Sequence, residues 1–353
     1  MKVIRAILVH LFTGANIATI LLLWACCGST YLHPADYPRL GLLGLAFPFI
    51  LIPNILFFFF WLIFKAKRVW LPVLGLLACF PFIRAYYSVS WNSEEPDSTA
   101  LSILSYNTCS YGHGSTAPKE NKQDCFAYLT TSDADIICLQ ESNRNAQLEK
   151  DMKAKGYDHF SSNEYSIYSR LPILSADPIS NVSKKPFALK AFLLYGQDTI
   201  MLINQHLQSN KLSLQVKNSY RKALEQHESD SVRKELRPIL QLLGAALPLR
   251  AAQADTLAAI IEQWLPRPVI VCGDFNDTPI SYVHSALTRH LTSAFIQSGH
   301  GLGFTFQEKG FPVRIDHILF SDDRWTSCQT RVDKSISCSD HYPVLTKLVK
   351  KAP

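Results

Sequence analysis

Residues 268–277 read Pro-Val-Ile-Val-Cys-Gly-Asp-Phe-Asn-Asp, and this stretch decides the fold because it carries a buried strand directly into a group of polar side chains. The apolar and β-branched residues before Gly273 predict a strand in the interior of a sheet. Asp274 and Asn276 follow where that strand ends, and Asp277 begins a turn. Ligands and catalytic groups of α/β folds gather at strand ends, so the stretch predicts a sheet and a site together.

Five more polar motifs follow apolar, strand-like runs elsewhere in the chain. They are Ser105-Tyr106-Asn107, Leu139-Gln140-Glu141, Asn204-Gln205-His206, Arg314-Ile315-Asp316-His317 and Ser339-Asp340-His341. Helical patterns separate several of the runs, at residues 120–130, 212–243, 251–264 and 281–290, and the second of these is expected to break near Pro238. Strands with interspersed helices predict a mixed α/β domain with more than one sheet.

The first 90 residues form an apolar region of their own, with two or three transmembrane helices. Residues 6–27 and 40–64 contain no charged side chain, and each is long enough to cross a bilayer at about 20 residues per span. Residues 69–83 are shorter and end at Arg84, so they form either a third span or a re-entrant segment.

Basic residues at both ends of these spans predict their orientation. Lys2 and Arg5 precede the first span, and Lys65, Lys67 and Arg68 follow the second. The positive-inside rule places both groups in the cytoplasm. With three spans, the rest of the chain lies outside the cytoplasm, and we expect a multi-pass protein of the plasma (inner) membrane with an extracytoplasmic C-terminal domain.

The net charge of +6 belongs to the membrane region and not to the C-terminal domain. Residues 1–90 hold seven basic side chains and one acidic side chain, which leaves 28 of each in the rest. A neutral domain lacks the basic surface of a tight, sequence-independent DNA-binding protein. This balance counts against a nuclease acting on bulk DNA and leaves small or lipid phosphoesters open.

The C-terminal domain is expected at residues 98–353, after a polar linker at residues 91–97. Residues 211–250 read as a helical insertion, which is either a solvated helical hairpin or an arm that lies near the bilayer. The dense Glu and Lys pairs favour the hairpin, and the apolar residues 239–243 are the feature that supports the arm. In an oxidising compartment two disulfides could form, one between Cys109 and Cys125 and one between Cys328 and Cys338.

The polar motifs, together with Ser169-Arg170-Leu171-Pro172-Ile173, resemble in their order the endonuclease/exonuclease/phosphatase superfamily, the deoxyribonuclease I-like fold. The resemblance covers about residues 98–350 and extends in layout to membrane-anchored bacterial members. It implies a four-layer α-β-β-α sandwich, with two mixed sheets packed face to face and helices outside. It also implies a hydrolase that acts on phosphoester bonds.

Cleavage of a phosphodiester needs charge neutralisation on the phosphate and an oriented water. Glu141 is the candidate metal ligand, with Asn107 and Asp340 beside it, because Mg²⁺ or Mn²⁺ prefers oxygen ligands. Alone, each of these residues has a simpler explanation. Asn107 would form a turn and Glu141 would be a solvated loop acid. The order and the strand-end positions of all the motifs together outweigh these explanations.

The remaining candidates supply acid and base chemistry. Asp274 is expected to orient and deprotonate the attacking water, and Asn276 to present its amide to the same phosphate. His341 and His206 would donate hydrogen bonds to phosphate oxygens, and Asp316 would fix the tautomer of His341. Alone, His206 could equally be a hydrogen-bonded core histidine.

These residues favour a membrane-anchored phosphodiesterase or nuclease that uses Mg²⁺ or Mn²⁺ and metal-assisted, in-line attack of water. Its partners are then the bilayer and a phosphoester substrate, either a nucleic acid or a small or lipid phosphodiester, with no obligate protein partner. A lipid or sugar phosphoester hydrolase, similar to sphingomyelinases or inositol phosphatases, is the enzymatic alternative. A catalytically silent, membrane-tethered binding module is the alternative from another class.

Overall fold

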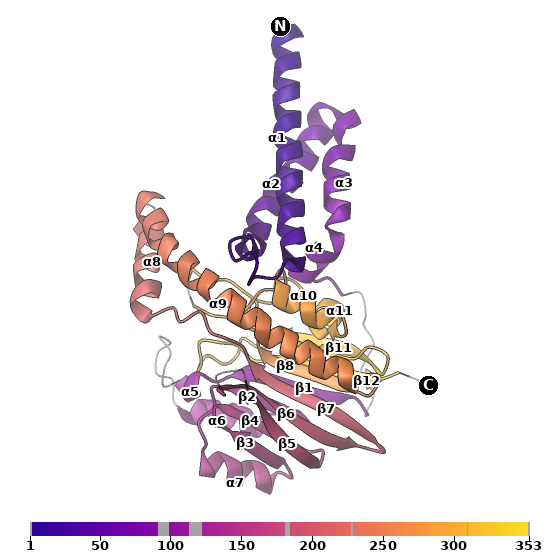
Figure 1. Cartoon of the computed structure of the whole chain (residues 1–353), viewed down its shortest axis with the longest axis vertical. Helices are drawn as coiled ribbons and strands as arrows, with labels where there is room; N and C mark the ends of the chain where they lie inside the picture. The colour runs from indigo at the N-terminus through magenta and orange to yellow at the C-terminus, as the bar shows by residue number, and fades with distance from the viewer. Residues whose placement is uncertain are drawn as a thin grey trace.

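A computed structural model describes residues 2–90, 99–112, 122–180, 184–226, 229–308 and 310–351. Figure 1 shows a bundle of N-terminal helices standing on one side of a C-terminal domain that is built from two sheets and flanking helices. The linker predicted at residues 91–97 lies outside the described residues. The N-terminal helices and the domain meet near α4 (Phe80–Tyr86), α10 (Tyr282–Thr288) and α11 (Ala294–Ser298).

Each sheet of the domain has six strands and contains one parallel pair. The first sheet has the order β11-β12-β1-β2-β4-β3, with β1 and β2 parallel. The second has the order β5-β6-β7-β8-β10-β9, with β7 and β8 parallel. The strands are β1 (Leu101–Asn107), β2 (Ile136–Gln140), β3 (Asp158–Ser162), β4 (Tyr165–Ser169), β5 (Ile173–Ser180), β6 (Pro186–Tyr195), β7 (Asp198–His206), β8 (Val269–Asp274), β9 (Thr292–Ser293), β10 (Asp316–Phe320), β11 (Trp325–Val332) and β12 (Val344–Lys350).

The two sheets pack face to face, and helices cover their outer faces. Ile103 and Ile136 of the first sheet share one buried cluster with Leu202 and Ile270 of the second. Behind the first sheet lie α6 (Lys122–Thr131) and α7 (Ala146–Ala154), and behind the second lie α10 and the end of α9 (Ser229–Trp264). The short helix α5 (Cys109–Gly112) follows β1. This arrangement confirms the predicted α-β-β-α sandwich.

Two helices of the N-terminal region are long and apolar enough to cross a membrane. They lie within residues 3–31 and 40–64 and correspond to α1 (Lys2–Gly28) and α2 (Leu43–Phe64). The predicted third span is broken into α3 (Trp70–Ala78) and α4, which are bent by 63°. Two or three crossings are therefore both compatible with the structure. Trp61 Nε1 donates to Asn16 Oδ1 at 3.0 Å, a polar contact that holds α2 to α1.

The apolar N-terminal helices are docked tightly onto the C-terminal domain. A side chain at Gly44 would place its Cβ 1.9 Å from the carbonyl oxygen of Ile280, so only glycine allows this approach. Ser88 pairs with Gly301 through two backbone hydrogen bonds, of 3.0 and 2.8 Å. The buried Arg314 donates to the carbonyl oxygens of Ala85 and Leu302. The two parts of the chain therefore form one packed unit.

The predicted insertion is an arm of two helices, α8 (Leu214–Gln226) and α9. The expected break near Pro238 is wrong, because α9 continues through Pro238 and Pro248 to Trp264. Its apolar residues recur at helical spacing and pack on the membrane side, where Leu247 Cδ1 would lie 3.0 Å from a Cβ at Gly41. Packing on that side outweighs the one hydrogen bond that each proline removes.

Neither anticipated disulfide is formed. The nine cysteines all lie within the described residues, are buried, and take part in no disulfide. Cys338 instead lies against the hydroxyl group of Tyr106, with 3.3 Å between Sγ and Oη, and shares a buried cluster with Cys125. The sequence did not predict that Cys125 and Cys338 would be neighbours.

Candidate functional site

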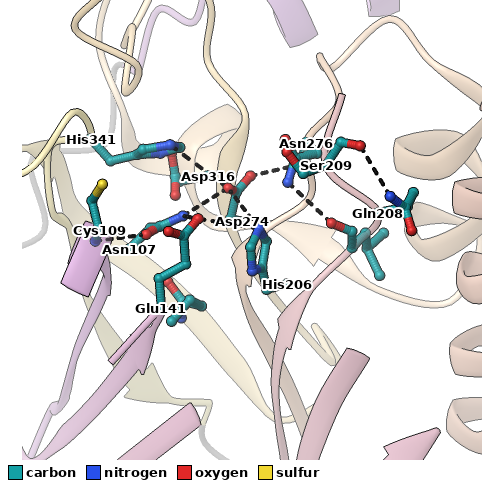
Figure 2. Close-up of polar contacts among 12 residues, drawn as sticks. Asn107, Cys109, Glu141, His206, Gln208, Ser209, Asp274, Asn276, Asp316 and His341 are labelled. Atoms are coloured by element: carbon teal, nitrogen blue, oxygen red, sulfur yellow. Dashed lines mark hydrogen bonds and ion pairs between the residues drawn. The ribbon is translucent and has the colours of Figure 1, made fainter. Parts of the chain in front are cut away.

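The polar motifs meet at one edge of the two packed sheets. In the first sheet, Asn107 at the end of β1 lies opposite Gln140 of β2, and Glu141 follows directly. In the second, Asp274 at the end of β8 lies opposite both His206 of β7 and Asp316 of β10. The parallel pairs β1/β2 and β7/β8 end at the same edge, and the antiparallel β10 begins there, so the side chains at these strand ends meet at a common point, as Figure 2 shows.

The backbone is unusual at three positions around this point. Gly273 has a φ of 133°, and a Cβ there would lie 1.9 Å from the carbonyl oxygen of Gln205, so the strand can approach β7 only with glycine. Glu141 and Asn276 adopt φ values of 47° and 50°, in the left-handed region that few side chains prefer. Such conformations are held by the surrounding structure and cluster at functional sites.

Two side chains bridge the carboxylates of Glu141 and Asp274. Asn107 Nδ2 donates to Glu141 Oε1 at 3.1 Å and to Asp274 Oδ2 at 3.0 Å. His206 Nε2 lies 3.6 Å from Glu141 and 3.7 Å from Asp274, while its Nδ1 lies 3.4 Å from Glu164 Oε1. The two sheets are thus joined through polar contacts at the site (Figure 2).

Asp316 holds His341 beside Asp274. Nδ1 of His341 and Oδ2 of Asp316 are 2.8 Å apart, and Nε2 of His341 lies 3.8 Å from Asp274 Oδ2. Thr305 Oγ1 accepts hydrogen bonds from the backbone N–H groups of Ile315 and Asp316, which fixes the start of β10. The predicted orienting role of Asp316 therefore has a direct geometric basis.

These contacts set the protonation of the buried groups. Burial alone lowers the pKa of His341, but the carboxylates of Asp316 and Asp274 outweigh it and raise that pKa to about 10. Burial raises the pKa of Asp274 to about 6, against the opposing charge of His341. Burial also lowers the pKa of His206, yet Glu164, Asp274 and Glu141 together raise it above its usual value. At neutral pH the site therefore pairs an ionised Asp274 with a charged His341.

Asn276 is already occupied by protein contacts. Its backbone N–H donates to Asp274 Oδ1 at 2.7 Å, and its amide nitrogen donates to the carbonyl oxygen of Leu207 at 3.1 Å. The geometry makes Asn276 a residue that positions Asp274, and the amide that was expected to face a phosphate points to the backbone instead.

The donor atoms fit a hard divalent cation only in part as predicted. Within the described residues, a candidate cluster of ligand atoms comes from Asp274, Asp316 and His341, all within 4.8 Å of one another. Glu141 offers a carboxylate that is 36% exposed, and oxygen donors of this kind suit Mg²⁺ or Mn²⁺. Asn107 turns its nitrogen to the carboxylates, while its oxygen accepts from the backbone N–H of Cys109. The carboxylate of Asp340 lies 3.8 Å from Lys217 Nζ.

Two contributors to the site were not predicted, and Arg170 of the Ser169–Ile173 motif lies outside the site. Glu164 contacts His206 from the turn between β3 and β4. Arg250, which is almost fully buried, donates to the carbonyl oxygens of Gln208 and Asn276. Arg170 lies elsewhere and contacts Asp133 and Asp135. A buried arginine in a helix carries no local sequence signal, so only the fold reveals its role.

Comparison with known proteins gives two matches along the sequence. A family model described as the endonuclease/exonuclease/phosphatase family matches residues 104–341. A second model, described as a domain of unknown function, matches residues 9–86. None of the curated proteins compared with the chain matches it.

Several solved structures are similar at low identity. Truncated TDP2 of Caenorhabditis elegans is 18% identical with a TM-score of 0.49, covering 70% of this chain and 97% of its own. The catalytic domain of human Nocturnin with bound sulfate is 15% identical with a TM-score of 0.48, covering 72% and 95%. An AP endonuclease from Archaeoglobus fulgidus is 14% identical with a TM-score of 0.47, covering 70% and 98%. At these values the structures support no inference about activity.

Proposed function

Because the chain belongs to the endonuclease/exonuclease/phosphatase family, we propose that it is a membrane-anchored, divalent-metal-dependent phosphodiesterase that acts at the outer face of the plasma membrane. The observation that carries the proposal is the meeting of Asp274, His341, His206 and Glu141 at one edge of the sheets. A silent binding module would not need a buried carboxylate and a charged imidazole in contact.

Glu141 is the residue that we expect to hold the ion, with Asn107 and Asp340 as the other members of the proposed set. The ion, when bound, supplies positive charge that polarises the phosphoester and lowers the cost of charge developing on it. Asn107 also steers Glu141 toward Asp274 through its two hydrogen bonds. Loss of the amide is therefore expected to weaken both metal binding and the alignment of the base.

The protein groups divide the proton chemistry between them. Asp274, held by the backbone N–H of Asn276, takes a proton from the attacking water. His341, which is charged, and His206 donate hydrogen bonds to the phosphoryl oxygens and stabilise the charge that accumulates there. Asp316 keeps His341 charged and in one orientation. The contacts among these side chains support this proposed division of roles.

The proposal is tested with the full-length protein in detergent and bis-p-nitrophenyl phosphate as substrate. Hydrolysis is expected with Mg²⁺ or Mn²⁺ and not after EDTA treatment. Asp274→Asn is expected to lower kcat by about 100-fold or more, the usual effect of losing a general base, and Glu141→Gln to raise the metal concentration needed. Asp133→Asn, at a fully exposed carboxylate, is the matched control. Full activity in Asp274→Asn would refute the proposed role.

A further inference from the structure

One cavity reaches from the polar site to the membrane helices. It has a volume of about 750 Å³, and its lining includes Glu141, His206, Asp274 and His341 at one end. At the other end it is lined by residues of α2 and by the arm of α8 and α9. Cavities of this size hold small ligands, and this one joins a polar centre to a helix long and apolar enough to cross a membrane.

The walls beyond the polar centre are apolar and partly face the bilayer. On α2, Phe49 is 73% exposed and Ile52 is 57% exposed, although both line the cavity. On the facing arm, Ile239, Leu243 and Leu247 complete the wall. Because α2 is expected to cross the membrane, the exposed faces of Phe49 and Ile52 meet acyl chains. The cavity is therefore open to lipid on the side of α2.

Basic side chains of the arm line a second cavity, which shares Leu236 and Leu240 with the first. Arg233, Lys234 and Arg237 of α9, together with Arg39, line this second cavity, against one acidic residue, Asp230. Clusters of this kind next to a membrane helix attract anionic lipid headgroups. The arm thus presents positive charge beside residues 38–42, which directly precede the candidate membrane helix α2.

We infer that the substrate is a membrane lipid phosphoester, whose phosphate reaches Asp274 and His341 while its hydrocarbon chain lies between α2 and the arm. This inference rests on the proposed function and names its substrate class. A nucleic acid gains nothing from aliphatic walls, and residues 91–353 carry equal numbers of basic and acidic side chains, so they offer it no excess of positive charge. A lipid phosphoester fits both ends of the cavity, because its phosphate suits the polar end and its hydrocarbon chain suits the apolar end.

The reaction is a hydrolysis that needs no further reactant. The water oxygen forms a bond to phosphorus, the bond from phosphorus to the leaving alkoxide breaks, and Asp274 takes the water proton. The alkoxide takes a proton from solvent and Asp274 returns its own, so charge and atoms balance. The products are an alcohol and a phosphate ester, one of which keeps the hydrocarbon chain.

The test compares two diesters that share a leaving group and differ only in the chain. Hexadecyl p-nitrophenyl phosphate and ethyl p-nitrophenyl phosphate both release p-nitrophenolate when they are cleaved by the full-length protein in detergent micelles. We expect kcat/KM to favour the hexadecyl ester by roughly tenfold or more, since burial of each methylene group is favourable. Equal values for the two esters would overturn the inference and leave the proposed function standing.

Variants on α9 separate the cavity from the chemistry. Leu243→Gln places a polar amide in the wall and is expected to reduce the hexadecyl preference by about tenfold while the ethyl ester is cleaved at nearly the normal rate. Leu249→Gln makes the same change on the same helix, at an exposed residue outside the cavity lining, and keeps the preference. An unchanged preference in Leu243→Gln would contradict the inference.

Two further measurements keep the outcomes distinct. Phe49→Ala trims the opposite wall, on α2, and is expected to reduce the same preference, which covers the case in which Leu243→Gln does not fold. A single-stranded DNA oligonucleotide cleaved faster than the hexadecyl ester would overturn the lipid assignment. If neither ester nor DNA is cleaved with metal present, the proposed function itself fails.

Discussion

Arg250 offers the sharpest test of how the site is held together. Its guanidinium group is 2% exposed, lies 3.3 Å from Asp277 Oδ2, and donates to the carbonyl oxygens of Gln208 and Asn276 and to Asn210. These contacts tie the segment after His206 to the turn after Asp274. Arg250→Met keeps much of the volume and removes every one of them.

The expected cost follows from the carboxylate that is left behind. Removing one partner of a buried ion pair costs about 3–5 kcal/mol, because the other charge stays buried without compensation. For a domain of this size that corresponds to a fall in Tm on the order of 10 °C. Arg250→Lys restores the positive charge, but a lysine cannot reach all four acceptors. Its Tm should therefore lie between those of the unmodified protein and Arg250→Met.

The pH dependence gives the same prediction a second readout. Burial raises the pKa of Asp277, and Arg250 opposes that rise. Without the arginine, the pKa of Asp277 in the folded protein rises further above its value in the unfolded chain. The ionised carboxylate then destabilises the folded state, and this cost disappears at low pH, where the carboxyl group is protonated. The loss of Tm should therefore be smaller at about pH 5.5 than at about pH 8.

The assay is thermal unfolding of the full-length protein in detergent, followed by intrinsic fluorescence. Arg233→Met, at an exposed arginine on the same helix, is the matched control and should leave Tm unchanged. A fall of less than about 2 °C in Arg250→Met, equal at both pH values, would refute the reasoning.

Three other predictions concern protonation. Hydrolysis should fall about tenfold per pH unit below about 6, where Asp274 becomes protonated, and a flat profile down to about pH 4.5 would contradict its role as base. Asp316→Asn should lower kcat by about 10–100-fold and move the alkaline limb, set by a His341 pKa of about 10, to lower pH; an unmoved limb would sink this assignment. Burial lowers the pKa of His284 to about 3, so stability should decrease as pH falls below about 6.5, where only the unfolded chain takes up the proton; His284→Gln should flatten that decrease in a denaturant titration.

The central strands could be predicted from sequence, and two edge strands could not. β1, β2, β7 and β8 are buried throughout or nearly so, which leaves a continuous apolar run in the sequence. β3 (Asp158–Ser162) pairs only with β4, and β5 (Ile173–Ser180) only with β6, and each is largely accessible on its outer side. Because these strands are exposed to solvent, their sequences contain many polar residues and lack the apolar pattern that predicts a strand.

The site was predicted best where function demands a residue type at a strand end. Asn107, Glu141, His206, Asp274, Asp316 and His341 converge as their motifs indicated. Glu164 and Arg250 escaped because their roles depend on contacts across the chain, to His206 and to Asp277. The spacing of residues along a sequence shows which residues are neighbours on one helix or strand. It does not show which residues of different helices and strands lie close together.

The seam between the anchor and the domain has a consequence for how the protein can be handled. Arg314, two residues before Asp316, uses the carbonyl oxygen of Ala85 as an acceptor, and Ser88 extends the chain against Gly301. Cutting the protein near residue 90 would remove the Ala85 carbonyl oxygen from the buried guanidinium group of Arg314. This group lies two residues before Asp316, which contacts His341. The apolar N-terminal helices thus support the candidate site from behind, and removing them is expected to loosen the segment that carries Asp316.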